Sequence, residues 1–210
     1  MGSRVIAVAC LASMLSVPSA RCDAADPLLD RMAGVNPGLH SYTATMRAHV
    51  SLTTFPFLAT DIVATVYHKD PDKNKVEITS GLPLVASQFG NLYPHIEPAA
   101  RWNDVYTVTR ISDDGSRTSY RLVPRAAGNV ERIDAVVDDK TATVSTMRWT
   151  YANGGTAEMD DTYSTIEGNL VVTSQAGEIN EPNYKGNVSA TLDHYAMNPV
   201  LDDALFEQHS

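Results

Sequence analysis

Residues 42–53 alternate between apolar and polar side chains, and this pattern constrains the fold more than any other feature of the sequence. A period of two predicts a β-strand with one buried face and one face in water. The apolar positions are Tyr42, Ala44, Met46, Ala48, Val50 and Leu52. A strand of this kind requires partners, so the chain is expected to form a sheet.

Turn sequences separate further strand-like segments along most of the chain. Tight turns are predicted at Asp113-Asp114-Gly115, Asp138-Asp139-Lys140, Asn153-Gly154-Gly155 and Glu167-Gly168-Asn169. The other predicted strands are 61–69, 75–79, 105–111, 118–123, 130–137, 141–150, 156–166, 170–174 and 184–195. Hairpin-linked strands pair antiparallel, and a sheet this wide must curl. We therefore expect a mainly β fold with a few helices and a curved antiparallel sheet.

Helices are expected at 26–34, within 81–100 and at 201–206. The middle segment carries apolar residues near helical spacing, interrupted by prolines, and predicts short helices lying across the sheet. Two interpretations stay open. These residues are a lid over a hydrophobic pocket, or they are plain core.

The first 24 residues have the pattern of a signal peptide. Arg4 precedes an uncharged apolar run at 5–17, and Pro18 and small residues follow. The run is too short to span a bilayer. Cleavage is expected between residues 19 and 24, which leaves residues 25–210 as one soluble periplasmic domain without a transmembrane segment. Cleavage after Ala24 removes both cysteines and with them any thiol chemistry.

The formal net charge of −9 describes an acidic chain. Nucleic acids and anionic lipid head groups require an excess of Lys and Arg, so nucleic acid is not expected as a partner. An acidic chain can still capture an apolar ligand, because buried area drives that binding.

Motifs for catalysis are absent from the sequence. It has no phosphate loop, no Gly-x-Ser-x-Gly elbow and no His-Glu-x-x-His. The six histidines form no close ligand pair, and aspartate doublets such as Asp113-Asp114 suit turns. We expect no enzyme activity, no metal and no cofactor. A hydrolase would require a histidine such as His95 or His194 in a cleft beside Ser or Asp.

Several segments resemble the LolA-like, outer-membrane lipoprotein-sorting proteins. The segments are Ser41-Tyr42-Thr43-Ala44-Thr45-Met46, Ala64-Thr65-Val66-Tyr67-His68-Lys69-Asp70-Pro71, Tyr106-Thr107-Val108, Tyr120-Arg121-Leu122-Val123-Pro124, Trp149-Thr150-Tyr151 and Tyr195-Ala196-Met197-Asn198. The resemblance covers most of residues 26–206. It implies an unclosed β-barrel with an α-helical lid around an apolar cavity for acyl chains.

One position departs from that family. The Arg that precedes Pro in the lipoprotein carrier ties the lid to the barrel, and Asp70 occupies the matching position here. A carboxylate cannot donate the hydrogen bonds of a guanidinium. The resemblance in fold therefore does not extend to the lipoprotein shuttle cycle, which uses that Arg.

These observations predict an exported periplasmic carrier or sensor for a lipid or acyl chain, with the acyl chains of lipoproteins among the candidate ligands. A monomer is expected, with an envelope donor or acceptor protein as a further partner. The alternative is a non-enzymatic envelope interaction protein with a filled core and no small-molecule ligand. The cavity wall is predicted to comprise Tyr42, Met46, Val50, Phe55, Phe57, Leu82, Val85, Phe89, Leu92, Ile96 and Trp149.

Overall fold

A ten-stranded antiparallel sheet makes up most of the chain in the computed structural model, which describes residues 26–54, 59–81 and 97–207. The spatial order of the strands is β3-β2-β1-β10-β9-β8-β7-β6-β5-β4. Their bounds are β1 (Ser41–Leu52), β2 (Ala59–Lys69), β3 (Lys73–Ser80), β4 (Tyr106–Asp113), β5 (Arg117–Pro124), β6 (Val130–Asp138), β7 (Thr143–Tyr151), β8 (Thr156–Ile166), β9 (Asn169–Asn180) and β10 (Lys185–Met197).

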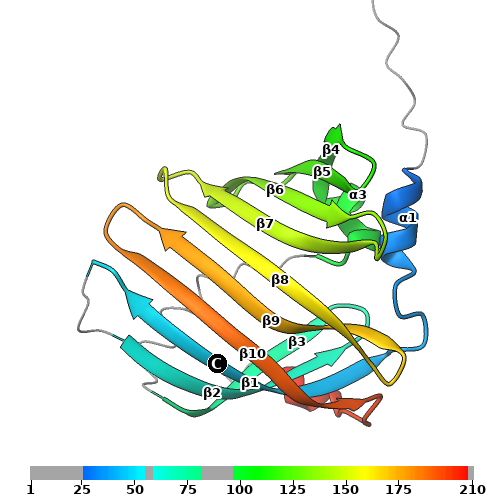
Figure 1. The fold of residues 1–210 in the computed structure, drawn as a ribbon, viewed down its shortest axis with the longest axis vertical. Helices are drawn as coiled ribbons and strands as arrows, with labels where there is room; N and C mark the ends of the chain where they lie inside the picture. The colour runs from blue at the N-terminus through cyan, green and yellow to red at the C-terminus, as the bar shows by residue number, and fades with distance from the viewer. Residues whose placement is uncertain (1–25, 55–58, 82–96, 208–210) are drawn as a thin grey trace, which may run out of the picture.

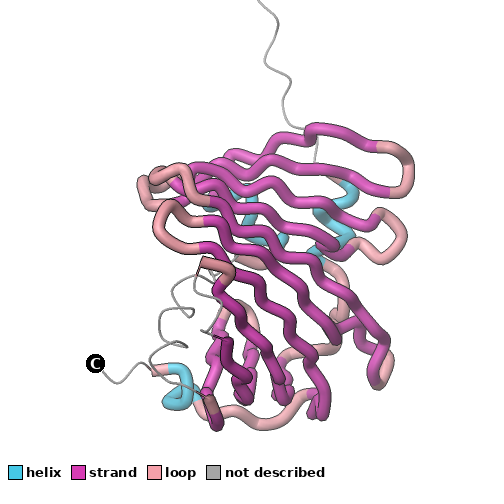
Figure 2. Tube along the Cα trace, turned by 60° about the vertical axis from the view of Figure 1, so that its left-hand side comes forward, coloured by secondary structure: helices cyan, strands magenta, loops and turns pink. Residues whose placement is uncertain are grey.

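The sheet curls without closing. β3 and β4 follow one another in the sequence, yet they are the two opposite edges of the sheet. Figure 1 shows five neighbouring strands running diagonally, in the order β2, β1, β10, β9 and β8, and the strands β4 to β7 turning away above them. Figure 2 shows the same bend from the side. The predicted mainly β fold with an unclosed, curved antiparallel sheet is confirmed.

The first strand joins the two ends of the chain. β1 pairs with β2 on one side and with β10 on the other, so Ala48 faces Ile62 and Ala190 in the two registers. The apolar positions of β1 lie on one face of the sheet, as the alternation predicted, and Ala44, Ala48 and Val50 are buried. This face is called the inner face below.

In the described residues four short helical segments accompany the sheet: α1 (Pro27–Ala33), η1 (Ala99–Arg101), α3 (Trp102–Val105) and η2 (Asp203–Phe206). α1 begins after Asp26, whose side chain caps Leu28 N at 2.9 Å, and Pro27 occupies the first turn. α1 and α3 lie over the strands from β4 to β7 (Figure 1). No helix in these described segments is long and apolar enough to cross a membrane.

The hairpin turns follow the predicted turn sequences. Glu167 and Gly168 have φ values of 49° and 81°, as a two-residue turn with two left-handed positions requires. Gly115 has φ of 85°, and its N–H donates to the Asp113 carboxylate at 2.7 Å. These local hydrogen bonds explain why Asp and Gly stand at the turns.

β9 extends to Asn180, beyond the predicted end at residue 174. The added part contains Gly177 between Ala176 and Glu178, so its apolar alternation is weak and the sequence indicated a loop. Non-local contacts decide the extension. A Cβ at Gly177 would lie 2.9 Å from the Glu158 carbonyl oxygen and 3.0 Å from a Val188 methyl group, which places this segment tightly between β8 and β10. Most of the predicted helical insertion, residues 82–96, lies outside the described residues.

Candidate functional site

The inner face carries two apolar clusters, and Met159 packs against both. The first cluster joins α1 and α3 to the strands from β4 to β9, and it comprises Leu28, Leu29, Trp102, Tyr106, Tyr120, Leu122, Ile133, Ala135, Val137, Ala142, Met147, Trp149, Tyr151, Ala157 and Ile179. The second cluster comprises Ala48, Val50, Ile62, Val188 and Ala190, with Met46 and Met159 packed against it. The second cluster contains strand residues alone, so the described helices cover one part of the inner face and not the other.

The predicted cavity residues divide between these regions. Val50 and Met46 lie in the second cluster, whereas Trp149 lies in the first, where its indole N–H is buried without a hydrogen-bond partner in the described chain. Tyr42 lies on the same face as Met46, near the start of β1. The remaining predicted residues lie outside the described segments: Phe55, Phe57, Leu82, Val85, Phe89, Leu92 and Ile96.

Aromatic side chains gather at the Tyr42 end of the inner face. The ring of Tyr42 stacks on His68 with centroids 5.0 Å apart, and its centroid is 5.6 Å from that of Tyr195. The hydroxyl of Tyr195 donates to the carbonyl oxygen of Val172. This bond fixes the Tyr195 ring across the space where β10 leaves β9, since their pairing ends at Thr191.

β8 reaches this region through Tyr163, which pairs in register with Val172, the residue whose carbonyl oxygen accepts the Tyr195 hydroxyl. Asp161 accepts a hydrogen bond of 2.8 Å from Gln175 Nε2, and Tyr163 follows two positions later. Burial raises the pKa of Tyr163, and the negative charges of Asp161, Tyr42 and Tyr195 in their ionised forms raise it further. Tyr42, Tyr163, Tyr195 and Asp161 are named the tyrosine site below. All four are half-buried.

Burial also shifts the other groups of the tyrosine site. It raises the pKa of the phenols of Tyr42 and Tyr195, so these rings are neutral at neutral pH. Burial raises the pKa of Asp161, and the hydrogen bond from Gln175 acts in the opposite direction. The site thus combines neutral rings with one carboxylate that burial destabilises in its charged form.

The sequence interpretation missed three of these four residues. Asp161 belongs to the doublet Asp160-Asp161, which lies within β8 and not at a turn. Asp160 accepts a hydrogen bond from Thr146 at 2.7 Å, whereas Asp161 bonds to Gln175 on the next strand. The available signal was an acidic residue in phase with Ala157 and Met159, on the apolar side of an alternating strand.

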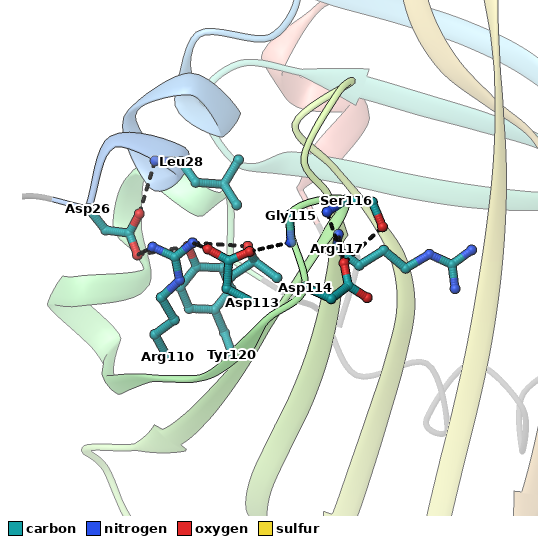
Figure 3. Close-up of polar contacts among 10 residues, drawn as sticks. Asp26, Leu28, Arg110, Asp113, Asp114, Gly115, Ser116, Arg117 and Tyr120 are labelled. Atoms are coloured by element: carbon teal, nitrogen blue, oxygen red, sulfur yellow. Dashed lines mark hydrogen bonds and ion pairs between the residues drawn. The ribbon is translucent and has the colours of Figure 1, made fainter.

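The other polar cluster on the inner face fastens α1 to the sheet (Figure 3). One carboxylate oxygen of Asp26 caps Leu28, and the other accepts the Tyr120 hydroxyl at 2.8 Å. Arg110 lies 3.9 Å from the second oxygen and pairs with Asp113 at 2.7 Å. Burial raises the pKa of Tyr120, and the hydrogen bond to Asp26 adds to this effect. Every group has a protein partner, which marks a structural anchor.

The turn beside that anchor is also structural. Asp114 accepts hydrogen bonds of 2.8 Å from the backbone N–H groups of Ser116 and Arg117 (Figure 3). These bonds favour the charged carboxylate and lower the pKa of Asp114. The expectation that this doublet serves a turn is confirmed.

Asp70 occupies the position at which the resembling family has Arg. Asp70 directly follows the last residue of β2. Its carboxylate lies 3.3 Å from His40 Nδ1 and 3.4 Å from His68 Nε2. The Asp70 carboxylate therefore accepts a hydrogen bond from His40 and lies within pairing distance of His68, whereas a guanidinium at this position would donate hydrogen bonds. His68 in turn stacks on Tyr42, so Asp70 adjoins the tyrosine site through this ring.

The outer face carries a shallow hollow of about 370 Å³ over β1, β2, β9 and β10. Asp61 and His49 lie in it with 2.7 Å between carboxylate oxygen and Nδ1, and Ser189 faces His49 on β10. In the described part of the chain, the His49 ring bonds to no hydroxyl group. His49 and Ser189 therefore do not form the nucleophile-to-base contact of a hydrolase in the described structure. The described segments also contain no cluster of three or more potential metal ligands.

No protein-family model and no curated protein matches the sequence. Solved structures do. An outer membrane lipoprotein-sorting protein domain from Vibrio parahaemolyticus is similar at a TM-score of 0.66 and 8% identity, covering 86% of this chain and 94% of the other. A LolA superfamily protein from Nitrosomonas europaea is similar at 0.61 and 11% identity, covering 87% and 96%.

A DUF1329 family protein from Desulfovibrio piger has a TM-score of 0.58 at 12% identity, covering 86% of this chain and 95% of the other. At such low identities the likeness concerns architecture alone. It nevertheless spans nearly the whole of each structure and agrees with the resemblance that the sequence motifs suggested. The curled ten-stranded sheet of this chain therefore has the LolA-like fold of the lipoprotein-sorting structures.

Proposed function

We propose that this protein is an exported periplasmic carrier or sensor that binds a lipid or acyl chain on the inner face of its sheet. The observation that carries the proposal is the second cluster, an apolar strip to which no described helix contributes. Apolar side chains there offer contact area along β1, β2 and β10. Burying an acyl chain contributes about 0.8 kcal/mol per methylene, so a long chain needs no charged partner for useful affinity.

Two observations support export and an envelope ligand. The segment 1–24 has the pattern of a cleaved leader, and the similar structures include a lipoprotein-sorting domain. We infer that the mature protein is a non-enzymatic monomer that meets an envelope donor or acceptor protein. Asp70 in place of the family Arg indicates that ligand release does not follow the lipoprotein carrier's lid mechanism.

A second function is supported by a different observation. Val50, Val188 and Ala190 have exposed fractions of 3%, 6% and 4%, which is the burial of ordinary core residues. A filled inner face would make the protein an envelope interaction protein without a small-molecule ligand.

Native mass spectrometry of the protein purified from its own envelope fraction separates these functions. A carrier is expected to show an added mass in the lipid range that is lost on denaturation. A bare mass, repeated after incubation with acyl probes, would contradict the carrier proposal and favour the interaction protein.

Met46→Gln tests where the chain binds. The substitution keeps the side-chain length, but it places an amide against the second cluster. We expect acyl-probe affinity to fall about five- to tenfold, which corresponds to about 1–1.4 kcal/mol of lost apolar contact. Thr45→Gln is the matched control, because Thr45 is the preceding residue of β1 and points to the outer face. Equal affinities for both variants would place the chain elsewhere.

A further inference from the structure

Asp161 is an unusual residue for its position. It is half-buried on the inner face, in phase with Ala157 and Met159 of β8. Its polar contact is the hydrogen bond from Gln175. Among residues 26–54, 59–81 and 97–207, no Lys, Arg or His lies within ion-pairing distance of it.

The negative charge of Asp161 is unfavourable in this setting, and the hydrogen bond from Gln175 does not require a charged acceptor. Removing a charge from water without a counter-charge is unfavourable. An Asn at this position could accept the same hydrogen bond from Gln175 and remain neutral. The charge of Asp161 is therefore unused by the described protein contacts, in contrast to that of Asp26, which has three partners.

The rings around Asp161 supply the second feature. Tyr42 and Tyr195 lie with centroids 5.6 Å apart and planes tilted by 53°. The Tyr195 hydroxyl donates to the carbonyl oxygen of Val172, and Val172 is the register partner of Tyr163 on the neighbouring strand. The phenol oxygens of Tyr42 and Tyr163 hydrogen-bond to no described residue. Tilted aromatic faces beside a carboxylate form a surface of negative potential, because the ring quadrupole is negative over each face.

We propose that the tyrosine site binds an ammonium head group, with Asp161 as its counter-ion and Tyr42, Tyr163 and Tyr195 as its aromatic walls. This inference rests on the proposed function, because the head group belongs to an amphiphile whose chain lies along the second cluster. Tyr42 and Met46 both lie in β1 and on the same face of the sheet. The head-group site therefore continues directly into the apolar strip. Anionic head groups are disfavoured by Asp161.

Isothermal titration calorimetry at pH 7 with two amphiphiles of equal chain length tests the proposal. The probes are dodecyltrimethylammonium and dodecyl maltoside, both below their micelle concentrations. The neutral probe reports binding of the chain alone. We expect the cationic probe to bind at least about tenfold more tightly to the wild-type protein, the size of a desolvated cation–π contact with a carboxylate nearby.

Asp161→Asn is the decisive variant, and Asp160→Asn is its matched control. Both remove one negative charge from β8, but Asp160 is exposed and hydrogen-bonds to Thr146. Asp161→Asn is expected to reduce the preference for the cationic probe to about twofold or less. Asp160→Asn is expected to retain it. Tyr163→Leu is expected to reduce the preference, and Tyr163→Phe to keep it, because the ring face survives in Phe.

The two probes also separate the head-group proposal from the carrier proposal. Binding of both probes with equal affinity would overturn the tyrosine site as a cation site and leave the carrier function standing. Loss of the preference in both Asn variants would show attraction to the net charge and would likewise overturn it. Binding of neither probe would overturn both proposals.

Discussion

Asp26→Ala should loosen α1 from the sheet and lower the free energy of unfolding by about 2.5–4 kcal/mol. The loss of the N-cap bond to Leu28 contributes about 1 kcal/mol. The loss of the charged partner of the Tyr120 hydroxyl contributes about 1.5–3 kcal/mol, because Tyr120 is 1% exposed and water cannot replace the carboxylate. α1 has seven residues and depends on its packing and cap for stability.

Tyr120→Phe completes the test as a double-mutant cycle. On its own it should cost about 0.5–1.5 kcal/mol, because the Asp26 carboxylate keeps its bond to Leu28 and its proximity to Arg110. In the double variant no hydroxyl is orphaned, so the two costs should not add. We expect a coupling energy of about 1–2 kcal/mol between the two positions.

Urea unfolding followed by circular dichroism measures all three variants. Midpoints should shift while the m-value is unchanged. Asp30→Ala is the control, because Asp30 lies in the same helix turn, is exposed and has no side-chain hydrogen bond among the described residues. It should cost less than about 0.5 kcal/mol. Additive costs at positions 26 and 120, or an Asp26→Ala effect as small as that of Asp30→Ala, would refute the anchor.

Two further predictions concern the β2–β3 region. Gly81→Ala should destabilise the protein by more than about 1 kcal/mol, because Gly81 has φ of 125° and a Cβ there would lie 2.9 Å from the Asp61 carbonyl oxygen. Gly38→Ala is the control and should have little effect, because a Cβ at Gly38 would meet no atom within 4 Å. Equal urea midpoints for the two variants would disprove the steric argument. Hydrogen bonds from Lys69 and Lys73 lower the pKa of Asp203 to about 2, so its pairing should stabilise the fold above pH 4 and be lost as the pH falls towards 2. Carboxyl NMR should show this low midpoint, and Lys69→Met should raise it; an ordinary midpoint in the wild type would mean that the contact does not form in solution.

The strands were predictable from sequence because their signals are local. The alternation at 42–53 reappears as β1 at Ser41–Leu52, and the Glu167-Gly168 turn follows from the backbone freedom of its residues. β9 was underestimated because a strand segment with Gly177 and few apolar side chains has no local signal. Its neighbours on β8 and β10 decide that it is paired.

The candidate site divides in the same way. The sequence marked Tyr42, Met46 and Val50 as one face of one strand, and the structure keeps them there. It gave no reason to join Tyr42 to Tyr163 and Tyr195, which are more than a hundred residues away. That association depends on β1 pairing with β10 at one side of a curled sheet and on β10 leaving β9 after Thr191.

By itself, the sequence determined the leader pattern, the acidic charge, most of the strands and the buried side of the first strand, since these depend on neighbours within a few residues. The tertiary structure alone decided that the inner face has two clusters, that α1 and α3 cover the first, and that Tyr42 meets Tyr195 while the Tyr195 hydroxyl reaches Val172, the register partner of Tyr163. The physical reason is that side chains distant in sequence meet only where strand pairing and sheet curvature bring them together, and neither is encoded in a local pattern.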